Sequence, residues 1–240
     1  MTAIRIGLVA EGPTDQIVIR SLVGNFFLQK TPNIELSFVD LQPTRDRTSG
    51  NSEGGWQMVY KWCLNNHPDS RLGQFFGQGL FASGLSASVC DILVIHMDAD
   101  ICEKLNGYTR VDCPTDLVSP TERGEFIKAV LHEWLWPAGT NPDDRHIEAP
   151  AVESVETWLI AGLGNNKENE KLRDPMTVLV DLDFALRGIK KPITARQIRK
   201  NGKRYKALSD KAAERVYDIA QDCIWFGNLA SRLTGQIGTH

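Results

Sequence analysis

The order of hydrophobic segments along the 240-residue chain predicts an α/β fold with a mainly parallel sheet flanked by helices. Residues 4–10 and 89–97 are short and almost wholly apolar, which is typical of strands that are buried on both faces. Longer segments with apolar residues every three or four positions lie between and after them. Strands that alternate with such helical segments are typical of parallel βα units.

The first part of the chain follows this pattern. Pro13 is suited to a first helical turn, and apolar residues at intervals of four continue a helix to about residue 27. Alternating apolar residues at 34–38 predict a second strand. Residues 42–55 are rich in Gly, Ser, Thr and Arg and predict a loop, and residues 56–66 predict a helix.

The second part begins with a clear helix start. Ser119 and Glu122 form a capping box around Pro120, which predicts a helix to about residue 136. The expected elements that follow are a strand at 146–152, a helix at 153–163, a loop at 164–174, and a mainly helical part from 176 with candidates at 208–221 and 224–234.

The formal net charge of −3 hides an uneven distribution. Residues 187–215 contain eleven Lys or Arg and two acids, so that segment carries +9 and the remainder carries −12. We therefore expect an acidic α/β domain over residues 1–165 and a basic, mainly helical C-terminal extension over residues 166–240. Ordinary hydrophobic and charged contents, 42% and 24%, exclude wholesale disorder.

The sequence composition also indicates the cellular compartment of the protein. The longest buried-looking apolar run, residues 92–95, is far shorter than the roughly 20 residues of a membrane span. Arg5 and Glu11 interrupt the N-terminal apolar stretch, so no signal peptide is expected. Five scattered Cys without a CxxC pair are typical of a reducing compartment. We expect a cytoplasmic protein with no membrane association.

Acidic residues follow two of the predicted strands. Glu11 comes after the first strand, and Asp98 and Asp100 end the central one. The carboxyl ends of parallel strands share one edge of a sheet, where ligands bind in this fold class. Crowded carboxylates raise one another's pKa values, and Mg²⁺, or alternatively Mn²⁺, relieves that conflict. This pattern predicts a metal site for phosphoryl chemistry, although strand ends also favour Asp for turn formation alone.

A third acidic element is Glu153-Ser-Val-Glu156. In the predicted helix two Glu three residues apart share a face, but acids are also favoured in a first turn by the helix dipole. A second DxD, at Asp181 and Asp183, fits a helix with both carboxylates on the solvent side. The five His show no paired spacing for zinc, and His96, inside the central strand, is interpreted as a satisfied core residue.

The segments Glu11-Gly-Pro-Thr-Asp15, Asp98-Ala-Asp100 and Glu153-Ser-Val-Glu156-Thr-Trp-Leu together resemble TOPRIM-like proteins. Within that superfamily the similarity is to the small bacterial RloB-like group, which is related to the nuclease domain of OLD-family proteins. The order and approximate spacing match over residues 4–165, and the remainder matches only loosely.

The resemblance implies a Rossmann-like TOPRIM fold and cleavage or transfer at phosphodiester bonds. Glu11 would serve as general acid/base or metal ligand, Asp98 and Asp100 would bind Mg²⁺, and Glu156 with Glu153 would complete a second metal position. Many relatives take part in phage defence beside an ATPase. This chain has no GxxxxGK(S/T), so an ATPase would be a separate subunit.

A nuclease also needs cations that approach the phosphates of its substrate. The candidates are Gly12, Thr14, Arg45, Arg47, Lys200, Lys203 and Arg204 for phosphate or nucleic-acid binding, and Lys206 for charge stabilisation during catalysis. A solvated helix face is the alternative interpretation of the basic segment. Tyr205 is a stacking residue or, more simply, a packing residue.

Two further functions stay open. The Asp98-Ala-Asp100 strand end also resembles the metal-binding DxD of nucleotide-sugar glycosyltransferases, for which Glu11 should be dispensable. The protein can also be a catalytically inactive regulatory subunit, in which the acids need not converge. The oligomeric state is open in all three cases.

Overall fold

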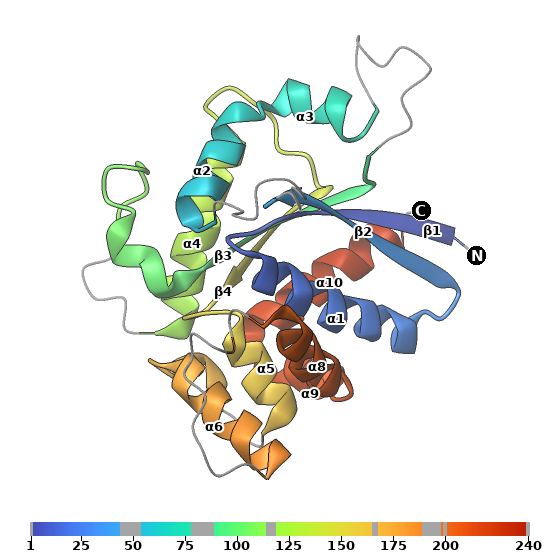
Figure 1. The fold of residues 1–240 in the computed structure, drawn as a ribbon. Coiled ribbons are helices and arrows are strands. Elements are labelled where there is room, and N and C mark those ends of the chain that lie inside the picture. Colours follow the sequence, from blue (N-terminus) through green and yellow to red (C-terminus); the bar gives the residue numbers. More distant parts are fainter. Residues whose placement is uncertain are drawn as a thin grey trace.

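The computed structural model describes residues 2–43, 54–77, 89–113, 119–164, 168–188, 198 and 201–238. Its centre is a four-stranded parallel sheet with the order β2-β1-β3-β4 (Figure 1). The strands are β1 (Thr2–Val9), β2 (Ile34–Gln42), β3 (Ile92–Asp98) and β4 (His146–Ala151). The predicted α/β class with a parallel sheet is confirmed.

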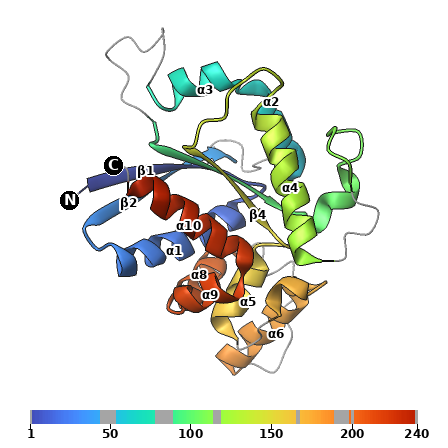
Figure 2. The same cartoon turned by 180° about the vertical axis from the view of Figure 1, so that it is seen from behind.

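Helices cover both faces of the sheet (Figures 1 and 2). One face carries α1 (Pro13–Lys30), α5 (Glu156–Leu163), α8 (Gly202–Ala213), α9 (Val216–Asp222) and α10 (Ile224–Ile237), with α6 (Pro175–Arg187) packed on α5. The other face carries α2 (Trp56–Asn65), α3 (Pro68–Gln74) and α4 (Pro120–Leu135). A short 3₁₀ helix, η1 (Ala99–Lys104), follows β3, and a second, η2 (Asn169–Lys171), precedes α6.

The alternation of side chains along the central strands divides the core into two layers. Ile92 and Val94 of β3 belong to the layer that contains α1, α5 and the C-terminal helices, whereas Leu93 and Ile95 belong to the layer with α2 and α4. Because successive residues of a strand point to opposite faces, a strand covered on both sides must be apolar throughout. This explains the uninterrupted hydrophobic run at residues 92–95.

The C-terminal helices share a hydrophobic core with the sheet. α8 packs on α1 and α5, and α10 packs on β4. The ring of Phe226 in α10 lies 5.4 Å from that of Trp158 in α5. The division of the chain near residue 165 stays a prediction. In the part of the chain that the structure describes, no helix is both long and apolar enough to span a membrane.

Local details differ from the sequence expectations at two helices. The helix predicted from residue 153 begins only at Glu156, because Glu153 adopts a left-handed backbone with φ of 57° in the preceding turn. Glu153 and Glu156 therefore do not share a helix face. The helix predicted at 208–221 is two helices, α8 and α9, that meet at residues 214 and 215. The capping box at Ser119 is confirmed, since its Oγ accepts a hydrogen bond from Glu122 N at 3.1 Å.

The close approach of α5 and α8 yields a stability prediction. A Cβ on Gly162 would lie 2.6 Å from the backbone oxygen of Ala212, and neither backbone can shift easily. Gly162→Ala should therefore lower the free energy of unfolding by about 1–3 kcal/mol, measured by denaturant unfolding. Gly235→Ala, in α10 with open space around it, is the control and should be neutral or stabilising. A Gly162→Ala protein as stable as the control variant would contradict this packing.

Candidate metal centre

The sheet has a topological switch point between β1 and β3. The chain leaves β1 for β2 on one side and leaves β3 for β4 on the other. In open α/β sheets ligands bind beyond the carboxyl ends of the strands at this point. Glu11 follows β1 and Asp98 ends β3, so two sequence-predicted acids lie there.

Asp98 joins three segments at this edge. Its backbone N–H donates to Glu11 Oε1 at 2.8 Å, which ties the end of β3 to the end of β1. Its Oδ1 accepts from the backbone N–H of Val155 at 3.0 Å, in the turn between β4 and α5. These two bonds fix the positions of the Glu11 and Asp98 carboxylates relative to each other.

Asp15 is a further buried acid in this cluster, although it was not among the predicted site residues. It lies in the first turn of α1, with a side chain that is almost fully buried. Its Oδ2 accepts from Gly12 N at 2.7 Å, and its Oδ1 accepts from the Thr14 hydroxyl at 3.3 Å. Gly12 and Thr14, predicted phosphate-binding residues, thus orient the Asp15 carboxylate.

His96 is the second residue that sequence reasoning did not place in the site. It is fully buried in β3, as predicted for a core residue. Its Nδ1 donates to the carbonyl oxygen of Ala149 at 2.8 Å, while its Nε2 lies 3.3 Å from Asp98 Oδ1. One side-chain ligand atom each from Asp15, His96 and Asp98 lies within 4.8 Å of the others. A cation can therefore contact all three groups.

Glu156, the first residue of α5, is the fourth acid of the cluster and lies near Asp15 and Asp98. Its Oε1 accepts a hydrogen bond from the Tyr205 hydroxyl of α8, and both side chains are buried. Tyr205 is thus a packing residue with a polar contact to the cluster. Through it the C-terminal helices contribute directly to the site.

The electrostatic state of the cluster follows from burial. Burial, with the nearby charges of Asp98 and Asp15, raises the pKa of Glu11 from 4.5 to about 9. Burial is also the main cause of the raised pKa values of Asp15 and Asp98, and the charge of Glu156 raises both further. Such a set of carboxylates needs protons or a cation to offset its mutual repulsion.

Asp100 and Glu153 lie in an adjoining outer pocket of about 130 Å³, which Arg173 and Asp174 also line. Arg123 reaches Glu153, with Nε 3.4 Å from Oε1. Burial raises the pKa of Glu153, and Arg123 opposes that rise. The four predicted metal ligands are therefore divided, with Asp98 and Glu156 in the inner cluster and Asp100 and Glu153 outside it.

The predicted basic residues have varied surroundings. Arg204 forms an ion pair with Asp183, which is buried rather than solvent-facing as expected, because the guanidinium compensates its charge. Lys206 is exposed and pairs with Asp210 one turn away. Lys203 is exposed. Arg45, Arg47 and Lys200 lie outside the described residues.

The start of α8 lies beside the cluster. A Cβ on Gly202 would be 3.8 Å from Ile17 Cδ1 of α1, and Tyr205, three residues further along α8, donates to Glu156 of the cluster. The first turn of α8, which includes Lys203, thus adjoins the residue that contacts Glu156.

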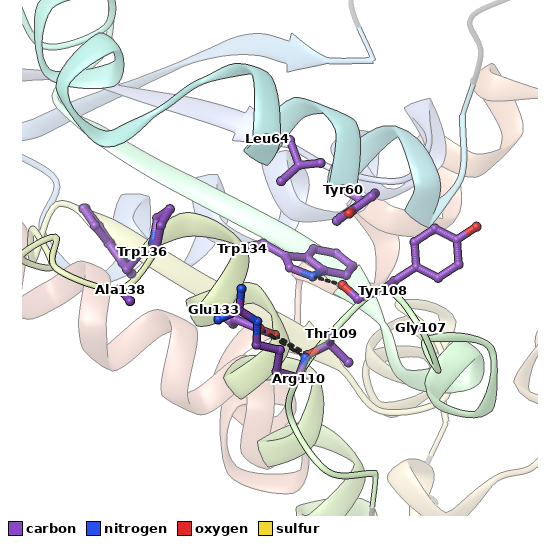
Figure 3. Close-up of a pocket in the computed structure, with 11 residues that line it drawn as sticks. Tyr60, Leu64, Gly107, Tyr108, Thr109, Arg110, Glu133, Trp134, Trp136 and Ala138 are labelled. Atoms are coloured by element: carbon purple, nitrogen blue, oxygen red, sulfur yellow. Dashed lines mark hydrogen bonds and ion pairs between the residues drawn. The ribbon is translucent and has the colours of Figure 1, made fainter.

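A separate pocket of about 610 Å³ lies between α2 and α4 (Figure 3). Tyr60, Tyr108 and Trp134 form its aromatic wall. Its carboxylate, Glu133, already accepts hydrogen bonds from Thr109 and the backbone of residue 110, and Trp134 Nε1 donates to Tyr108 O at 2.8 Å. Since the Glu133 carboxylate of this pocket is already hydrogen-bonded, the acidic cluster is the stronger candidate for chemistry.

Comparisons with protein-family models, with curated proteins and with solved structures found no match to this chain. Function is therefore inferred from the fold and from the chemistry of the acidic cluster.

The raised pKa of Glu11 predicts a pH-dependent stability. An acid whose pKa is raised on folding destabilises the folded state above its unfolded pKa, near 4.5, and the cost grows as the pH rises toward 9. Glu11→Gln keeps the Oε1 acceptor and removes the charge. In EDTA at pH 8 this variant should be more stable than wild type by about 1–3 kcal/mol, and the gain should shrink near pH 5.

Denaturant unfolding at the two pH values measures this difference. Glu125→Gln, at an exposed position of α4, is the control and should leave the pH dependence unchanged. If the free energy of unfolding depends on pH equally in wild type and Glu11→Gln, the raised pKa of Glu11 is contradicted.

Proposed function

We propose that the protein is a divalent-metal-dependent nuclease of the TOPRIM type, which hydrolyses or transfers phosphodiester bonds of nucleic acid. The observation that supports this most is the convergence of Glu11, Asp15, Asp98 and Glu156 at the switch point between β1 and β3. Asp15 and Glu156 are buried, and Glu11 and Asp98 are partly buried; acids in such surroundings are costly unless their charge is used.

The donor set fits a divalent cation, because carboxylate oxygens are the preferred ligands of Mg²⁺ and Mn²⁺. When bound, such an ion neutralises charge on phosphate oxygens and activates water. Asp98 and Asp15 are held in place by backbone N–H groups of Val155 and Gly12, and Glu156 is held by Tyr205. The binding groups are therefore oriented before substrate arrives.

Glu11 is suited to proton transfer. Its Oε1 accepts the Asp98 N–H bond, so a proton on this carboxyl resides on Oε2. Burial and the charges of Asp98 and Asp15 raise the pKa of Glu11 to about 9, which favours a protonated carboxyl at neutral pH. It can then donate a proton to the oxygen that leaves phosphorus, as a general acid.

The contact between Glu11 and Asp98 also favours the nuclease over the glycosyltransferase, in which Glu11 should be dispensable. Lys203, at the start of α8, is a candidate for approaching substrate phosphates. A separate ATPase subunit and a role in bacterial defence against phage are part of the proposal and rest on the resemblance to RloB-like proteins.

The nuclease proposal predicts metal-dependent cleavage that depends on two carboxylates. With labelled single- and double-stranded DNA and RNA, wild type should cleave at least one substrate in Mg²⁺ or Mn²⁺ and none in EDTA. Asp98→Asn and Glu11→Gln should each lower the rate by about 100-fold or more.

Asp181→Asn is the matched control, because Asp181 belongs to the second DxD but lies exposed on α6, and it should retain wild-type activity. Cleavage that survives both cluster substitutions would exclude this site. Loss of activity in Asp98→Asn alone, with binding of a nucleotide sugar, would favour the glycosyltransferase.

A further inference from the structure

The tautomer of His96 is set by its hydrogen bond. Its Nδ1 lies 2.8 Å from the carbonyl oxygen of Ala149, and a carbonyl oxygen can only accept. Nδ1 therefore carries the proton, and in a neutral imidazole Nε2 carries the lone pair. Histidine ligands of metals are oriented in this way, with the second ring nitrogen donating to a backbone carbonyl.

The lone pair of Nε2 points into the acidic cluster. Nε2 is buried and has no hydrogen-bond partner among the described residues, and it lies 3.3 Å from Asp98 Oδ1. Oδ1 already accepts the Val155 N–H. Two acceptor atoms that face each other without a hydrogen bond between them are unfavourable unless a proton is placed on Nε2 or a metal cation contacts both.

The spacing suits such a cation. Two adjacent ligands of an octahedral ion with bonds near 2.1 Å lie about 3.0 Å apart, close to the distance between Nε2 and Oδ1. Asp15 brings a further carboxylate oxygen within 4.8 Å of one ligand atom of His96 and one of Asp98. The ring of Trp158 packs against the imidazole at 5.8 Å between centroids, which restricts rotation of His96.

We propose that Asp15, His96 and Asp98 form a mixed nitrogen and oxygen site that binds a first-row transition-metal ion such as Mn²⁺ in preference to Mg²⁺. An imidazole nitrogen adds affinity for first-row transition metals, whereas Mg²⁺ favours oxygen ligands and bound water. His96 is thus a metal ligand and not only a core residue. The inference deepens the proposed function, which supplies the reaction that the ion would serve.

The direct test is a spectroscopic measurement on the full-length wild-type protein. After removal of metals by chelation, Mn²⁺ alone is added and the electron spin-echo modulation of the bound ion is recorded. A nitrogen coupling typical of an imidazole ligand is expected. Bound Mn²⁺ without a nitrogen coupling would overturn the inference, and this result needs no variant to fold.

A binding measurement tests the preference. Calorimetric titration should show that wild type binds Mn²⁺ at least 10-fold more tightly than Mg²⁺. In His96→Gln, with folding checked by circular dichroism, Mn²⁺ binding should weaken at least 10-fold and the nitrogen coupling should disappear, while Mg²⁺ binding changes little. His67→Gln, at an exposed position, is the matched control and should behave as wild type.

The outcomes separate this inference from the nuclease proposal. A nitrogen-coupled Mn²⁺ site without cleavage of any nucleic acid would retain the metal site and reject the nuclease. If cleavage depends on Asp98 but His96→Gln binds each metal as tightly as wild type does, the nuclease is retained. His96 is then rejected as a ligand.

Discussion

The candidate site depends on the contacts of Asp98. Its backbone N–H binds Glu11 after β1, and its carboxylate binds the backbone of Val155 before α5. One residue at the end of β3 thereby joins the neighbouring strand on one side to the β4–α5 turn on the other. The parallel sheet makes this possible, because the carboxyl ends of all four strands lie at the same edge.

The same arrangement concentrates negative charge where solvent is largely excluded. Burial raises the pKa values of Glu11, Asp15 and Asp98, so the acids destabilise the metal-free fold as the pH rises above their unfolded pKa values of 3.8 to 4.5. Hydrophobic packing elsewhere must offset that cost. A group of acids that weakens the fold unless it binds a cation is more easily explained by function than by stability.

The sequence predicts the framework of this protein better than its site. Apolar runs identify the strands and the capping box at Ser119 identifies α4, because these signals are local. The acids at the ends of β1 and β3 are also visible. His96 had a weaker signal, since it lies two residues before Asp98 and so on the same face of β3.

Other parts depend on contacts between distant residues, which no local pattern reports. The Tyr205 hydroxyl binds Glu156 across 49 positions of sequence, and Arg204 compensates a buried Asp183 that its helix pattern places in solvent. Glu153 leaves the predicted helix because the turn after β4 instead presents Val155 N to Asp98. At this turn a tertiary hydrogen bond overrides the helix propensity of the local sequence.

The most direct measurement is anomalous diffraction from crystals of the full-length protein soaked in Mn²⁺. An anomalous peak bounded by Asp15, His96 and Asp98 is expected. A peak only in the outer pocket at Asp100 and Glu153, or none at the switch point between β1 and β3, would contradict a metal centre formed around Asp98.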